Sequence, residues 1–132
     1  MLLLALLIST VRAEDLRVGL VGDLKLSAQK ASVVSYPTLQ KALEARPQVL
    51  GISPAVALGA QELASLPVPT FVMDTPQAHK IKNPNLVLAK DVAQDLELAL
   101  KVCDPSLFKS AMHLRACLTP HREKLYPQRP TP

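Results

Sequence analysis

Short runs of apolar residues alternate with amphipathic segments along most of the chain, and this pattern predicts strands that alternate with helices. The clearest instance lies near the middle of the chain. Val49–Ile52 and Thr70–Met73 are apolar runs typical of strands that are buried on both faces. Between them, the Ala- and Leu-rich stretch Ala55–Leu66 predicts a helix that begins after Ser53 and Pro54 and ends at a proline. We therefore expect a strand–helix–strand unit here.

The same pattern predicts further elements on both sides of this unit. The predicted strands are Leu16–Gly22, Ala31–Val34 and Leu86–Ala89, and the predicted helices are Pro37–Ala45, Asp91–Val102 and a last helix from Pro105 through Leu114. Residues 75–80 predict a turn or a short helical piece. The resulting order, β, β, α, β, α, β, β, α, α, favours an α/β fold. We expect a three-layer sandwich with a small, mainly parallel sheet, that is, a single Rossmann-like lobe.

The two ends of the chain differ from its body. Leu2–Ile8 is a short apolar run, and the segment ends at Ala13 like a signal-peptidase site. This predicts that residues 1–13 are a signal peptide, cleaved after Ala13, and that the protein is periplasmic or secreted. No Lys or Arg precedes the apolar run, so we expect either a start that lies upstream or an atypical signal. The alternative to a signal peptide is a buried first strand or helix. Four prolines from Pro120 onward predict a disordered tail over 120–132, which leaves one α/β domain over 14–119.

Composition and charge make a nucleic-acid partner unexpected. The formal net charge is +4, but the basic residues gather in the last part of the chain. From Pro105 onward the chain contains one acidic residue, Glu123, and five basic residues, which are Lys109, Arg115, Arg122, Lys124 and Arg129. The body is nearly neutral and the chain has no Trp, two Phe and two Tyr, so neither a basic face nor a stacking platform is indicated. The basic segment is interpreted as a solvated tail or as a contact for an acidic partner.

The two cysteines predict a disulfide. Cys103 and Cys117 lie fourteen positions apart and bracket the last predicted helix. In an exported chain an even pair of cysteines is typical of a disulfide. The alternative is a metal site that adds His113 and His121, although the CxxC or HxxxH spacing of close ligand pairs is missing. If the chain is not exported, both cysteines are expected to be small buried hydrophobic residues. No metal or cofactor is predicted.

Polar residues follow several of the predicted strands. In an open parallel sheet, ligands bind beyond the carboxyl ends of the strands. This rule selects Asp23, Tyr36, Ser53, Asp74 and Thr75 as candidate ligand-binding residues. The backbone amides at Ser53 would open a helix and hold an anion or a carboxylate, unless Ser53 serves only as the helix N-cap. Asp74 has a similar alternative, since an aspartate in this position commonly caps the following turn.

Catalytic motifs are missing from the sequence. It contains no nucleophile elbow, phosphate-binding loop, dinucleotide fingerprint or HExxH. A catalytic function would gain support if the structure placed Asp74 and His79 within hydrogen-bond reach in a deep pocket. We therefore predict a protein that binds rather than transforms its ligand.

The stretch PTLQKALEARPQVLGISPAVALGAQELASLPVPTFVMDTP is similar in plan to one lobe of the periplasmic solute-binding proteins of ABC importers, in the siderophore, cobalamin and metal-binding group. In that group a helix leads to a KPDLV strand, which Arg46–Leu50 matches loosely, and then to a gIPVVVvD strand, which Leu66–Asp74 matches. Gln48 stands where the family has Asp. The resemblance implies a single-lobe binding module for a small molecule. Because the 132 residues accommodate one lobe, capture between two lobes is not implied, although a homodimer would rebuild the cleft. The alternative is a protein–protein adaptor of an envelope, secretion or conjugation system.

Overall fold

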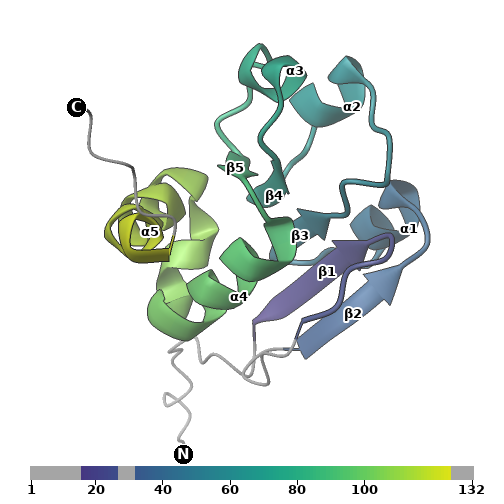
Figure 1. Ribbon diagram of the computed structural model, residues 1–132. Coiled ribbons are helices and arrows are strands. Elements are labelled where there is room, and N and C mark those ends of the chain that lie inside the picture. The colour runs from purple at the N-terminus through teal and green to yellow at the C-terminus, as the bar shows by residue number, and fades with distance from the viewer. Residues whose placement is uncertain (1–15, 27–31, 126–132) are drawn as a thin grey trace, which may run out of the picture.

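Five parallel strands form one sheet in the computed structural model, which describes residues 16–26 and 32–125 (Figure 1). The strands are β1 (Arg17–Val21), β2 (Ser32–Tyr36), β3 (Val49–Ile52), β4 (Thr70–Met73) and β5 (Leu86–Ala89). Their order across the sheet is β2-β1-β3-β4-β5, with Val18 of β1 beside Val33 of β2 and Val49 of β3. This is the strand order of the flavodoxin-like doubly wound folds. The predicted signal peptide, residues 1–13, lies outside the described residues.

Helices cover both faces of the sheet and complete the expected three layers. Figure 1 shows α4 and α5 together on one side of the sheet. On one face lie α1 (Leu39–Glu44), α2 (Ala60–Ala64) and α3 (Pro76–His79), and on the other lie α4 (Val92–Val102), the 3-10 helix η3 (Pro105–Lys109) and α5 (Ala111–Leu125). The prediction of a three-layer α/β sandwich with a parallel sheet is confirmed.

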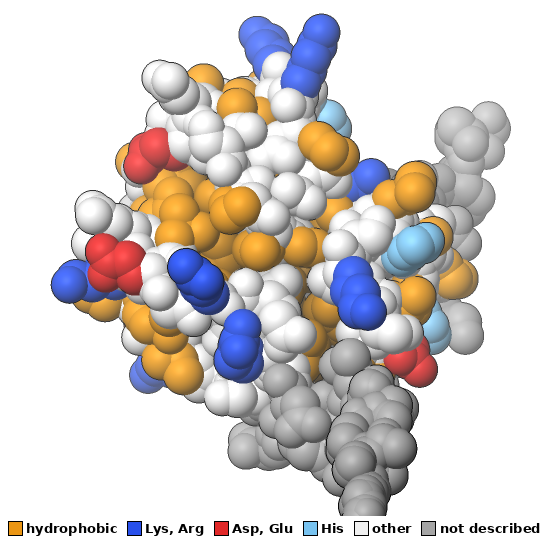
Figure 2. All heavy atoms as spheres, turned by 180° about the vertical axis from the view of Figure 1, so that it is seen from behind, with side chains coloured by type: hydrophobic (Ala, Val, Ile, Leu, Met, Phe, Trp, Pro, Cys, Tyr) orange, Lys and Arg blue, Asp and Glu red, His pale blue; other side chains and the backbone are white. Residues whose placement is uncertain are grey.

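The two helical layers cover the sheet unequally. On the α4/α5 face, long helices bury large side chains such as Phe71, Leu96 and Leu114 completely. The helices of the opposite face have only four to six residues each, and hydrophobic residues such as Leu39 and Leu43 remain partly exposed there. Figure 2 shows hydrophobic side chains gathered in a hollow on this face. The thin layer therefore leaves apolar surface open to solvent.

The helix predicted over Ala55–Leu66 is shorter than expected, because Ser53 forms a turn instead of a helix N-cap. The Ser53 hydroxyl oxygen accepts a hydrogen bond from the Ala55 backbone N–H (3.2 Å), and the Ser53 carbonyl accepts one from Val56 (2.9 Å). Helix α2 begins only after Gly59, whose N–H donates to the Glu62 carboxylate (2.9 Å). The prediction that Ser53 opens a helix is wrong.

The end of the fold also differs from the prediction. The segment from Pro105 divides into η3 and α5, and hydrogen bonds from the Ser106 backbone N–H (2.9 Å) and hydroxyl (2.8 Å) lower the pKa of the Asp104 carboxyl at the start of η3. Helix α5 continues through Pro120 to Leu125, so the tail predicted from Pro120 is wrong for residues 120–125. Residues 126–132 lie outside the described part of the chain.

Two arginines of α5 cover the outer edge of β5. The Arg115 guanidinium donates to the carbonyls of Pro84 (3.2 Å) and Leu86 (2.9 Å), and the Arg122 guanidinium donates to the carbonyl of Leu88 (2.8 Å). These are alternate carbonyls along an edge strand. Unpaired edges of this kind invite pairing with other chains, and covering them is a common protection. The two guanidinium groups thus donate hydrogen bonds at the edge where a sixth strand would otherwise pair.

Two further contacts fix α5 against α4. The Asp95 side chain on α4 is 1% exposed and forms an ion pair with Arg122 on α5, with 2.7 Å between Oδ2 and Nη2. The disulfide between Cys103 and Cys117, with Cα atoms 6.1 Å apart, joins the end of α4 to the middle of α5. The predicted disulfide is therefore confirmed, and both thiols are used in it. In the described part of the chain, no group of three or more potential metal-ligating side chains is found.

The backbone at the end of α1 supports one stability prediction. Arg46 follows the helix with φ of 52°, a left-handed conformation that glycine adopts more readily than other residues. Its N–H donates to the Leu43 carbonyl (3.0 Å), and Arg17 binds its carbonyl, so the contacts within this turn use only the backbone of Arg46. We expect Arg46→Gly to stabilise the protein by about 0.5 kcal/mol. Glycine removes the free-energy cost of holding a side-chain-bearing residue in the left-handed conformation, and this gain exceeds the cost of the extra freedom that glycine gives the unfolded chain.

Urea unfolding measures this effect, with Arg46→Ala as the matched control. Alanine removes the same side chain but keeps the left-handed cost, so this variant should gain nothing. A glycine variant less stable than the alanine variant would contradict the explanation.

Candidate functional site

The rim at the carboxyl ends of the strands, where the sequence predicts the ligand site, contains a hollow of about 230 Å³. Ser53 and Thr75 both line it, together with mostly apolar residues such as Val56, Leu58 and Met73. The Ser53 side chain is buried and bonded to its own turn. The Thr75 hydroxyl oxygen accepts a hydrogen bond from the Ala78 N–H (3.1 Å) and caps α3. Both hydroxyl groups therefore have local structural partners.

The other three predicted residues do not line this hollow. Asp74 lies beside it, and its carboxylate contacts the His79 imidazole at 2.5 Å, but these side chains are 40% and 62% exposed. Asp23 is exposed after β1. Tyr36 ends β2 and packs against the core beneath α1–α3. The structure thus brings Ser53 and Thr75 together and leaves Asp23, Tyr36 and Asp74 outside.

The turn after β1 and the loop after β3 lie in close contact where the strand order of the sheet reverses. A doubly wound sheet commonly binds its ligand here, because the strand order reverses between these two strands. Gly22, at φ +88°, follows β1, and a Cβ atom at this position would lie 2.5 Å from Val56 Cγ2 and 2.9 Å from Ser53 Cβ. The loop after β3 therefore packs directly on the turn after β1. This contact lies at the usual ligand position of such a sheet.

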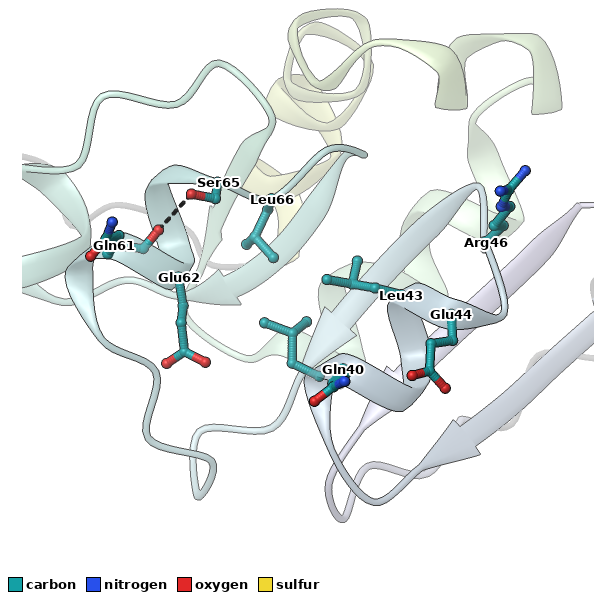
Figure 3. A pocket seen from close by; sticks show the side chains of 9 residues that line it. Gln40, Leu43, Glu44, Arg46, Gln61, Glu62, Ser65 and Leu66 are labelled. Atoms are coloured by element: carbon teal, nitrogen blue, oxygen red, sulfur yellow. Dashed lines mark hydrogen bonds between the residues drawn. The ribbon is translucent and has the colours of Figure 1, made fainter.

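A larger groove of about 810 Å³ lies between α1 and α2 (Figure 3). It opens on the thinly covered face of the sheet. Its lining residues are Leu39, Gln40, Leu43, Glu44 and Arg46 in and after α1, and Gln61, Glu62, Ser65 and Leu66 in and after α2. The two helices that border it are short, with six residues in α1 and five in α2. Its volume is within the range of ligand sites, whereas the hollow at the rim is smaller than that range.

The groove combines an apolar centre with polar margins. Figure 3 shows Leu43 and Leu66 pointing toward one another across it. The Ser65 hydroxyl donates to the Gln61 carbonyl (2.9 Å) and so is used within α2. The lining contains no histidine or cysteine beside Ser65 that would activate it as a nucleophile. The arrangement is suited to holding a molecule with an apolar body.

The sequence predicts the apolar helix face that lines this groove but not the groove itself. Leu39 and Leu43 lie one turn apart, which predicts a helix face directed at the core. Both side chains are instead partly exposed, because α2 begins at Ala60 and leaves their outer side uncovered. The groove therefore depends on the length of a neighbouring helix, which the apolar pattern overestimates.

These features define a small doubly wound α/β protein with an apolar groove on one helical face. No protein-family model matches the chain, and comparisons with curated proteins and with solved structures found no match. In residues 16–26 and 32–125, none of the helices has both the length and the apolar character needed to cross a membrane.

Proposed function

We propose that this is an exported, non-catalytic binding protein that holds a small, largely apolar ligand in the groove between α1 and α2. The observation that carries the proposal is the groove itself, with a leucine centre, polar margins and a volume of about 810 Å³. Concave sites of this size, mostly apolar with a few polar groups, are typical of small-molecule binding. The protein would act as a single-lobe, solute-binding-like module that takes its ligand on a helical face.

The disulfide supports export. Disulfides form and persist in oxidising compartments outside the cytoplasm. The Cys103–Cys117 bond joins two helices of the folded domain, and Cys103 is almost fully buried. Together with the signal-like composition of residues 1–13, this supports a periplasmic or secreted location.

Binding is favoured over catalysis by the exposure of the Asp74–His79 pair. The two side chains are within hydrogen-bond reach, which is one condition for an acid–base pair. The second condition, a deep pocket, is not met, because both side chains are substantially exposed and neither lines the hollow at the rim.

The alternative of an adaptor that docks through its basic end receives less support. Two of its five basic residues, Arg115 and Arg122, bind the carbonyl groups of β5 within the fold. Their charges therefore serve the attachment of α5 rather than a partner. Removal of residues 126–132 is the truncation that separates the binding protein from the adaptor, because it leaves the contacts of Arg122 in place.

Binding of the neutral fluorescent probe N-phenyl-1-naphthylamine tests the groove directly. We expect the probe to bind the native protein and Leu43→Gln to weaken binding about tenfold, because this change removes apolar surface from the centre of the groove.

Met73→Gln is the matched control, since Met73 is 43% exposed and lines the hollow at the rim instead. It should leave the affinity for the probe unchanged. Loss of binding in the Met73 variant with full binding in the Leu43 variant would place the site at the rim and refute the proposal.

A further inference from the structure

We infer that the ligand of the α1/α2 groove is an amphipathic cation, that is, an ammonium group attached to a hydrocarbon body. This inference rests on the proposed function, because it names the chemical class of ligand for the same site. It is carried by the way charged side chains are distributed around the leucine centre.

Carboxylates stand on both walls of the groove. Glu44 belongs to α1 and Glu62 belongs to α2. Figure 3 shows Glu62 on α2 across from Gln40 on α1, with Glu44 on the far side of Gln40 from Glu62 and Arg46 away from them. The apolar centre is thus bordered by one carboxylate from each wall. A ligand whose hydrocarbon lies over the leucines would place its polar end toward one of these carboxylates.

Both carboxylates have capacity to accept further hydrogen bonds. Within the described residues, no ion pair or hydrogen bond of the Glu44 side chain is found, and this residue is exposed. Glu62 accepts the Gly59 N–H through Oε1, which leaves Oε2 for a ligand. An ammonium group has three donors and no acceptor, so it matches either carboxylate better than a hydroxyl or a carboxylate does.

The net charge of the protein works against this preference. At +4, the chain as a whole attracts anions rather than cations. A preference for a cation would therefore have to arise locally, at Glu44 and Glu62. Because these carboxylates are solvent-exposed, we expect a modest selectivity of about fivefold that decreases with added salt.

Three ligands with the same hydrocarbon chain test the inference. Octylamine is a cation at neutral pH, octan-1-ol is neutral and octanoate is an anion, so their competition with N-phenyl-1-naphthylamine separates charge from hydrophobicity. We expect octylamine to bind about fivefold more tightly than octanoate, with octan-1-ol between them. In the double variant Glu44→Gln/Glu62→Gln, the difference between octylamine and octanoate should fall below about twofold.

The variants are matched to the local structure. Glutamine at position 62 keeps an acceptor for the Gly59 N–H, so the start of α2 is preserved. Asp74→Asn removes one exposed negative charge outside the groove and should leave the fivefold difference intact.

The outcomes separate this inference from the proposed function. Equal binding of octylamine and octanoate, or a preference that survives the double variant, would overturn the inference while displacement of the probe upholds the groove as a site. Failure of the probe itself to bind the native protein would overturn the proposed function and the inference with it.

Discussion

Replacement of Arg122 by methionine is expected to destabilise the protein by about 3 kcal/mol. Arg122 forms an ion pair with Asp95, whose side chain is 1% exposed. Removal of one member of a buried pair leaves the other charge in a low-dielectric environment without that partner. The same change also deprives the Leu88 carbonyl, at the edge of β5, of its hydrogen bond. Urea unfolding followed by circular dichroism measures the loss.

The double variant Asp95→Leu/Arg122→Met is the control for this prediction. It removes both charges and fills the space with apolar side chains, a replacement that is often nearly neutral. We therefore expect the double variant to recover most of the stability that Arg122→Met loses. A single variant as stable as the native protein would show that the ion pair does not hold α5 in place.

Removal of the disulfide is the second change with a large expected effect. In the chain-entropy model, a bond that closes a loop of about fifteen residues stabilises the native state by roughly 3 kcal/mol. The Cys103–Cys117 bond closes a loop of this size, with a sequence separation of 14. For a domain of about one hundred residues, this corresponds to a fall in Tm of about 10 °C or more.

Differential scanning calorimetry with and without a reducing agent measures this fall, and Cys103→Ala/Cys117→Ala should reproduce it. The reducing agent should then leave the Tm of the double alanine variant unchanged. An identical Tm for the oxidised and reduced native protein would mean that α5 does not depend on the bond. Since Arg122 and Cys117 anchor the same helix, the two losses are not expected to add fully.

The sheet could be predicted from the sequence because its strands are short apolar runs. Val49–Ile52 is buried along its whole length, as the absence of polar residues in it predicts. The disulfide could also be predicted, since the sequence offers only one pair of cysteines. Both inferences depend on residue type and spacing, which are visible without the fold.

The boundaries of α2 and α5 could not be predicted, because the residues at these boundaries are compatible with more than one local structure. Ser53-Pro54 is typical of a helix start, but the Ser53 hydroxyl accepts a hydrogen bond from the Ala55 N–H and closes a turn, and the helix begins after Gly59. Pro120 usually ends or kinks a helix, yet α5 continues beyond it, and Arg122 is held there by contacts with distant residues. These partners lie far away in the sequence, so no local pattern contains them.

The candidate site could be predicted even less well from the sequence, because it too depends on contacts between distant residues. The rule that ligands bind at strand ends selects Ser53 and Thr75, which line the same hollow in the structure. It does not reveal that Val56 packs on Gly22, between the ends of β1 and β3. Nor does the sequence show that α2 begins too late to cover Leu39 and Leu43 of α1. The groove is a property of helix lengths and of packing between helices, and the side chains that line it carry no motif.

A titration followed by two-dimensional ¹H–¹⁵N NMR tests the central claim, which is that the ligand binds between α1 and α2. With octylamine as the ligand, we expect the largest shift changes at the backbone amides of residues 39–46 and 60–66, with little change at residues 53–58 and 73–78. Changes concentrated in the latter two segments would place the site at the strand ends and contradict the account.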